Sequence, residues 1–318
     1  MSTIEDTIFE RLGRTRQSYV NVLSEMFERD RVLMGLTVGP AALLMLFAAF
    51  VPVVWALNLS LHEASALDPT WTWIGVENYT EILGSTTYWE AFNRSLIFGF
   101  GSVALQLVVG VGTALMLSRE FRGVILARAM IFLPYLIPTV VVGMVFRLLL
   151  NGSYGIWNVF LLDLGIIQEN IAWLAEPDWA MISLVVLNSW KFAIFITIMV
   201  LARLQSIPDQ FYEAATMNGA GPLRKFRDVT FPQIKGVILL TLLLRGIWMF
   251  NKFDIIFITT GGGPGRITTT LPIHVYRVAF LEFKLGQAGA IAGTLFAFLG
   301  VGAIIYFIGF NPANEVGR

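Results

Sequence analysis

The sequence predicts an all-α membrane protein built as one bundle of six transmembrane helices. Of its 318 residues, 56% are hydrophobic and only 14% are charged, and the mean hydropathy is +0.70. A chain of this composition buries its apolar surface in lipid. About 20 mostly apolar residues are needed to cross the hydrocarbon core as a helix. Six segments meet this requirement: 33–59, 95–118, 128–149, 179–203, 236–260 and 286–310.

The composition also excludes several functions. The net charge is zero, so it gives no support to nucleic-acid binding, which needs a basic patch. The absence of cysteine excludes disulfides, iron–sulfur clusters and thiolate metal sites. His62 and His274 lie in different loops without clustered ligands, so we expect no metal site.

The N-terminal segment, 1–32, precedes the first span and lacks the features of a cleaved signal peptide. We expect the first span to serve as the uncleaved targeting signal. Within residues 4–30, apolar side chains recur at near-heptad spacing: Phe9, Leu12, Tyr19, Leu23 and Met26. This pattern fits an amphipathic helix on the inner leaflet, and equally a partly ordered tail.

Prolines occur inside two of the predicted spans. Pro40 and Pro52 lie in the first span, and Pro134 and Pro138 lie in the third. Neighbouring helices can satisfy the backbone groups that a proline frees, so these residues need not break a packed span.

Lysine and arginine set the predicted orientation. They are concentrated before the first span, between spans two and three, and after span four, around Arg203, Arg224, Lys225, Arg227 and Lys235. Positive loops face the cytoplasm, so the chain is predicted to be a multi-pass protein of the plasma membrane with both termini inside. The domain organisation is then a cytoplasmic segment, 1–32, a six-span domain, 33–310, and a cytoplasmic tail, 311–318.

The loop 204–235 is predicted to form two short helices at the membrane surface. Ser206 has the character of an N-cap, with Pro208 in the first turn. Asn218 and Gly219 can end the first helix with a left-handed residue, and Pro222 can open the second. This arrangement suits docking into a groove of a partner protein, although an amphipathic loop folding back onto the membrane would have the same pattern.

The residues of this loop carry a resemblance. Their order and spacing resemble the cytoplasmic signature of permease subunits of binding-protein-dependent ABC importers: Glu213, Ala214, Ala215, Gly219, Ala220, Phe226 and Pro232. Asn218 and Gly236 depart from the common pattern, where an aspartate and a second proline are frequent.

Two further segments resemble external signatures of the sugar subgroup, similar to maltose- and glycerol-3-phosphate-type permeases. These are the run 75–79 and the glycine loop 260–265, which is followed by residues 271–280.

The resemblance implies a heteromer. Such a permease forms the translocation path of a sugar importer with a second, homologous permease, and an extracytoplasmic binding protein delivers the solute. Two ATP-binding subunits carry ATP and Mg, so this chain itself is expected to be neither an enzyme nor a holder of cofactors. The Glu213 helix would couple the spans to an ATPase subunit.

Polar side chains within the predicted spans mark a candidate translocation path. Ionisable groups in a span are costly and usually face a cavity or one another. Span four contains Asn188 and Lys191 on one face, and span five adds Arg245, Trp248, Asn251 and Lys252, with Asp254 nearby. These side chains could bond and stack on a sugar. Alternatively, Arg245 or Lys252 could pair with Asp254 or a partner subunit and hold the bundle together. As a further alternative, span five could be shifted, with Lys252 snorkelling outward.

A stand-alone secondary transporter or channel is the rival interpretation. Such proteins usually show repeated halves or broken helices in matched positions, and neither is evident in the sequence. The glycine run 261–265 lacks the Gly-Lys-Ser/Thr ending of a phosphate-binding loop, so it is interpreted as an external turn.

Overall fold

The structure is a computed structural model that describes residues 35–310. The predicted N-terminal helix, 4–30, and the tail, 311–318, therefore lie outside the described residues. The chain divides into two compact units, residues 1–58 and 59–318. Within the first unit the main described element is α3 (Gly39–Leu59), an apolar helix that stays continuous through Pro52. It corresponds to the first predicted span.

The structure confirms the predicted helical fold. Four helices in the described chain are long and apolar enough to cross a membrane: α3, α5 (Thr86–Leu117), the continuous helix Pro222–Phe250, and α16 (Leu285–Phe310). Two bent pairs bring the number of spans to six if each pair counts as one. These pairs are α6 (Val124–Leu136) with α7 (Thr139–Leu149), and α9 (Pro177–Phe192) with α10 (Ile194–Gln205).

The third predicted span, 128–149, is broken at its prolines. The axes of α6 and α7 differ by 93°. The break falls at Ile137, whose backbone is extended with ψ of 130°, directly before Pro138. The residue before a proline is pushed out of the helical region by a clash with the proline ring, which explains the position of the break.

The fourth span is also bent, by 41° between α9 and α10. The bend lies against α5, where Gly110 allows a close approach. A Cβ atom at Gly110 would lie 2.9 Å from the carbonyl oxygen of Ala193 and 2.7 Å from Cβ of Ile196. Because Gly110 has no side chain, the backbone of α5 at this position packs directly against the side chain of Ile196 in α10.

The fifth span is shifted toward the N-terminus relative to the predicted range 236–260. One continuous helix runs through α12 (Pro222–Lys225), a π-helical turn η1 (Phe226–Thr230) and α13 (Phe231–Phe250). The second short helix expected at Pro222 is therefore the first turn of this span. The helix ends at Asn251, whose side-chain amide donates to the carbonyl oxygen of Ile247, and a separate helix follows.

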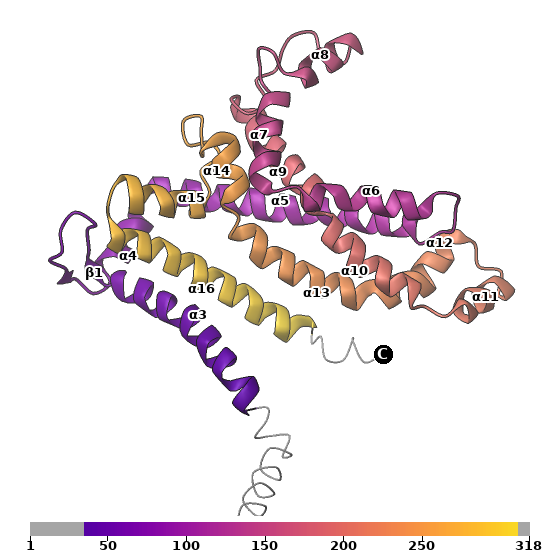
Figure 1. Cartoon of the computed structure of the whole chain (residues 1–318), viewed down its shortest axis with the longest axis horizontal. Coiled ribbons are helices and arrows are strands. Elements are labelled where there is room, and N and C mark those ends of the chain that lie inside the picture. Colours follow the sequence, from indigo (N-terminus) through magenta and orange to yellow (C-terminus); the bar gives the residue numbers. More distant parts are fainter. Residues whose placement is uncertain (1–34, 311–318) are drawn as a thin grey trace, which may run out of the picture. The chain divides into compact units, whose positions relative to one another are not determined.

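The second unit is organised around α5, which packs against α9, α10 and α13 (Figure 1). The short helix α11 and α12 lie at one end of α10 and α13, and α4 and α15 lie at the other end of α5. The shorter elements are β1 (His62–Glu63) paired antiparallel with β2 (Thr72–Trp73), α4 (Glu77–Gly84), α8 (Ile156–Asp163), α11 (Asp209–Met217), α14 (Asp254–Thr260), α15 (Leu271–Tyr276) and the π-helical η2 (Arg277–Leu281).

Candidate functional sites

The loop 204–235 contains the predicted first helix as α11 (Asp209–Met217), but its start differs from the prediction. The N-cap position belongs to Pro208 and has no side-chain cap. The hydroxyl of Ser206 instead donates to the carbonyl oxygen of Arg203 at 2.8 Å, so Ser206 closes the end of α10. Serine caps either end of a helix through local side-chain bonds, and the sequence does not distinguish the two.

The end of α11 is as predicted. Gly219 adopts the left-handed conformation with φ of +71°. The amide of Gly219 donates to Thr216, and that of Ala220 donates to Ala215, both at 2.9 Å. These bonds satisfy carbonyl groups that the helix end leaves without partners.

The loop is tied to the ends of two spans. The guanidinium of Arg203 in α10 donates to the backbone oxygen of Gln233 at 2.9 Å and to its side-chain oxygen at 2.7 Å. The hydroxyls of Tyr212 in α11 and Thr230 in η1 lie 3.2 Å apart. A force on α11 can therefore reach both α10 and the helix that contains α13.

The outer surface of the loop is apolar and exposed. Met217 is 87% exposed, Leu223 is 82% exposed, and Phe211 is 50% exposed. A surface cavity of about 440 Å³ adjoins Leu223 and is lined by Gly221, Pro222, Leu223, Arg224 and Arg227. Large exposed apolar side chains in one small element are typical of an interaction surface.

The predicted coupling residues are distributed over this loop. Glu213 is exposed on α11 and forms no hydrogen bond or ion pair with the residues that the structure describes. Ala214 is exposed beside it and Ala215 is half-buried. Phe226 lies in η1 with its ring centroid 6.2 Å from that of Phe231. Gly219 and Ala220 form the cap of α11, and Pro232 is the second residue of α13.

The candidate path residues include a buried polar cluster between α5, α9 and α13. Nε of Arg245 donates to Oε1 of Gln106 at 2.7 Å, and Arg245 is only 2% exposed. The amides of Gln106 and Asn188 both donate to the sulfur of Met249, at 3.2 and 2.9 Å. Oδ1 of Asn188 is buried without a hydrogen-bond partner.

Lys191 lies apart from this cluster although it shares a helix with Asn188. Its ammonium donates to the carbonyl oxygens of Pro134, at 3.0 Å, and of Ile137, both at the break between α6 and α7. These carbonyls are at the C-terminal end of α6, where a cation is favourable. Lys191 thus satisfies backbone groups that the break releases.

The phenyl ring of Phe192 lies among three cations. Its centroid is 5.3 Å from Nζ of Lys191, 5.3 Å from the guanidinium carbon of Arg245, and 4.1 Å from Nζ of Lys252. Lys252 also forms an ion pair with Asp254 at 3.0 Å. This pairing was one of the alternatives that the sequence left open.

Trp248 and Asn251 are the exposed members of the predicted path set. The indole ring of Trp248 is 45% exposed and lies 5.5 Å from the guanidinium carbon of Arg245. The amide of Asn251 is turned back onto its own helix, where it donates to Ile247.

Sequence reasoning missed Gln106 and Met249. Gln106 is fully buried and is the direct hydrogen-bond partner of Arg245. A glutamine inside an apolar span was a usable signal, because a buried amide needs a partner. Nothing in the sequence indicated that the sulfur of Met249 accepts hydrogen bonds from two amides.

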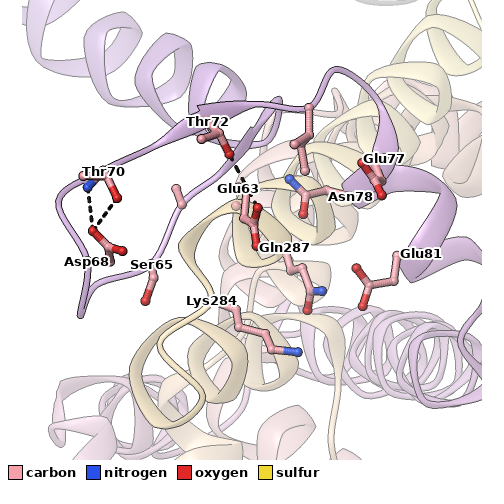
Figure 2. A pocket seen from close by; sticks show the side chains of 13 residues that line it. Glu63, Ser65, Asp68, Thr70, Thr72, Glu77, Asn78, Glu81, Lys284 and Gln287 are labelled. Carbon is pink, nitrogen blue, oxygen red and sulfur yellow. Dashed lines mark hydrogen bonds between the residues drawn. The ribbon is translucent and has the colours of Figure 1, made fainter.

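A second cavity, of about 570 Å³, opens at the end of the bundle opposite α11 (Figure 2). The run 75–79 contributes Glu77 and Asn78 to it. The side-chain amide of Asn78 donates to the carbonyl oxygens of Ser60 and His62, each at 2.9 Å. The polar wall of the cavity is completed by Glu63, Ser65, Asp68, Thr70, Thr72, Glu81, Lys284 and Gln287. Hydrogen bonds from Thr70 lower the pKa of Asp68.

These features define the chain as a polytopic helical membrane protein with an exposed apolar loop at one end of its bundle. Residues 106–310 match the family described as "Binding-protein-dependent transport system inner membrane component". The chain belongs to this family and is a permease component of a binding-protein-dependent ABC importer.

Individual relatives agree with this assignment. The chain is 34% identical to the trehalose/maltose transport system permease protein MalF of Thermococcus litoralis, over 85% of this chain and 89% of that protein. It is 35% identical to the sulfoquinovosyl glycerol transport system permease protein SmoG of Agrobacterium fabrum, over 84% and 87%. The crystal structure of a bacterial importer of alginate has a chain with the same fold, with a TM-score of 0.76 at 21% identity, covering 93% of this chain and 99% of that one.

The structure weakens one step of the sequence argument. Repeated halves or broken helices in matched positions were not evident in the sequence, and this counted against a secondary transporter. The structure contains two broken pairs, α6–α7 and α9–α10. The distinction therefore rests on the family, whose members are transport permeases and not enzymes.

Proposed function

We propose that this chain forms the translocation path of an ATP-driven sugar or polyol importer together with a second, homologous permease. An extracytoplasmic binding protein delivers the solute, and two ATPase subunits hold ATP and Mg. The chain lies in the plasma membrane with both termini in the cytoplasm. The sugar-transport permeases among its relatives support this assignment of the solute class.

The loop 204–235 couples this permease to an ATPase subunit. The observation that carries this proposal is α11, which combines exposed Phe211 and Met217 with an unpaired, exposed Glu213. An apolar helix with one charge fits a groove on a partner. The bonds from Arg203 to Gln233 and between Tyr212 and Thr230 would pass movement of the helix to the spans.

Within the spans, we propose that the solute path is lined by residues from the predicted set: Asn188, Lys191, Arg245, Trp248, Asn251 and Lys252. The exposed indole of Trp248 offers a flat apolar surface for a sugar ring, and the guanidinium carbon of Arg245 lies 5.5 Å from it.

The coupling proposal can be tested by charge reversal at Glu213. We expect Glu213→Lys to abolish ATPase assembly or solute-stimulated ATP hydrolysis in the reconstituted importer. Loss of one partner of a buried interfacial charge pair costs about 2–5 kcal/mol, which is more than a tenfold loss of affinity. The control is Gln210→Lys, which places a lysine at an exposed position of the same helix without removing a carboxylate.

The outcome discriminates between docking and a surface role. If Glu213→Lys assembles and drives uptake as well as Gln210→Lys does, α11 is not the coupling element. If the chain alone moves solute in vesicles without ATPase subunits, the importer mechanism fails. The solute itself would be identified by asking which candidate, bound to the binding protein, stimulates ATP hydrolysis by the complete complex.

A further inference from the structure

The loop between α7 and α9 has an inverted pattern of burial around α8 (Ile156–Asp163). Its polar Asn158 is 2% exposed and is buried on the same helix as Leu161, whereas the neighbouring Ile156 is 67% exposed. In a water-exposed loop the polar side chain would face outward and the apolar ones inward. Such an inversion indicates that the surroundings of α8 are apolar.

The inside of the loop is held by hydrogen bonds to Asn158. Its side-chain amide donates to the carbonyl oxygen of Ile171 at 2.9 Å and lies 3.4 Å from those of Asn151 and Gly152. Its side-chain oxygen accepts from the indole of Trp173 at 2.7 Å and from the backbone amide of Ile171 at 3.3 Å. The side chain of Asn158 therefore holds the loop together. Its burial follows from these hydrogen bonds.

The outside of α8 is mostly apolar. At about 100° per residue, its exposed apolar side chains fall on one side of the helix: Ile156, Trp157, Val159, Phe160 and Leu164. The exposed Asp163 lies on the same side, in the last turn of the helix. The rings of Trp157 and Phe160 stack with centroids 5.6 Å apart. We name the set of apolar side chains the α8 face.

The preceding helix carries α8 sideways from the bundle. Figure 1 shows α6 alongside α5, a helix long enough to cross the bilayer, so α7, which is turned by 93° from α6, lies close to the membrane plane. Figure 1 shows α7 and α8 projecting away from α5 and α6. The path of the chain thus keeps α8 near the depth of the bilayer and does not carry it far into water.

We propose that the α8 face lies in the bilayer, where its side chains contact lipid hydrocarbon next to the headgroups. Aromatic residues are typical of this boundary, and Tyr154 and Trp157 are both exposed here. The apolar face of an interfacial helix penetrates the boundary between headgroups and acyl chains. This contact is independent of the coupling role of α11.

The charges of the loop specify the kind of lipid surface. No lysine or arginine occurs between Arg147 and Lys191, and the charged side chains there are all acidic. The α8 face therefore gains nothing from anionic headgroups and inserts equally well into a zwitterionic bilayer.

Site-directed spin labelling of the assembled importer tests this proposal. Because the chain has no cysteine, Phe160→Cys would provide a single label site in it, in a complex whose other subunits also lack accessible cysteines. The matched control is Asn170→Cys, an exposed polar position of the same loop. Each labelled complex is reconstituted into phosphatidylcholine vesicles, and collision rates are measured with oxygen, which concentrates in lipid, and with a water-soluble nickel chelate.

We expect the label at residue 160 to collide more with oxygen than with the nickel chelate, and the label at residue 170 to show the reverse order. Adding phosphatidylglycerol should leave both results unchanged. If residue 160 is as accessible to nickel as residue 170, the α8 face is in water and the proposal is wrong. If residue 160 is shielded from both reagents, the face is covered by protein, and the second permease replaces lipid as its partner.

Discussion

Replacement of Lys191 with methionine tests how the broken third span is held. The ammonium donates to two carbonyl groups at the break between α6 and α7, and Lys191 is only 2% exposed. A hydrogen bond to a charged group contributes about 1.5–3 kcal/mol, so two bonds contribute about 3–6 kcal/mol. Part of this loss of free energy is offset, because a buried methionine carries no charge that must lose its hydration. We expect a net loss of about 2–4 kcal/mol.

Thermal denaturation of the purified complex in detergent would measure this loss. A change of 1 kcal/mol shifts the unfolding midpoint of a chain of this size by about 2–4 °C, so Lys191→Met should lower it by about 4–16 °C. The control is Lys252→Met, because the pair of Lys252 with Asp254 is partly exposed and such pairs contribute about 0–1 kcal/mol. Equal midpoints for the wild type and both variants would refute the role of Lys191 at the break.

Two other predictions concern packing and pH. Gly110→Ala should destabilise the chain by about 1–3 kcal/mol, because the new Cβ would lie 2.7 Å from Cβ of Ile196. Gly112→Ala, whose Cβ would meet nothing within 4 Å, should be nearly neutral, and equal effects would contradict a tight contact of α5 with α10. In α15, outside the spans, burial lowers the pKa of His274 below its usual value of about 6.5. The fold therefore favours neutral imidazole, and its contribution to stability is complete above about pH 6.5 and declines as the pH falls toward the lower folded pKa. Midpoints measured from about pH 8 to 5 should show this decline, and His274→Gln should remove it.

The helical fold was predictable because lipid imposes a simple rule on composition. A helix must be long and apolar to cross, so hydropathy alone located the bundle. The predicted helix boundaries were wrong where interactions of the local backbone determine where a helix ends. Pro138 turned the third span by forcing Ile137 out of the helical region, and Asn251 ended the fifth span early. Hydropathy windows do not contain this information.

The candidate sites were predictable to different degrees. The loop 204–235 was located from its residue order, and its cap at Gly219 followed from local chemistry. The path candidates were chosen because they are polar in an apolar span, but their partners required the three-dimensional structure. Gln106 precedes Arg245 by 139 residues, and Lys191 reaches carbonyls 54 and 57 residues away. No spacing rule within one helix connects such residues.

The contacts of the buried cations also rank the path candidates. Lys191 is compensated by the end of α6, and Lys252 by Asp254, whereas Arg245 has no carboxylate partner among the described residues. Cation–π contacts contribute about 0.5–2 kcal/mol each, and a buried ion loses several kcal/mol of hydration. The three aromatic rings 5.3–5.8 Å from its guanidinium carbon and the hydrogen bond to Gln106 offset that loss, but none of them neutralises the charge. A buried cation without a counter-ion marks a functional position more strongly than a paired one. Arg245, with the exposed indole of Trp248 beside it, is for this reason the first of the six candidates to test for solute contact.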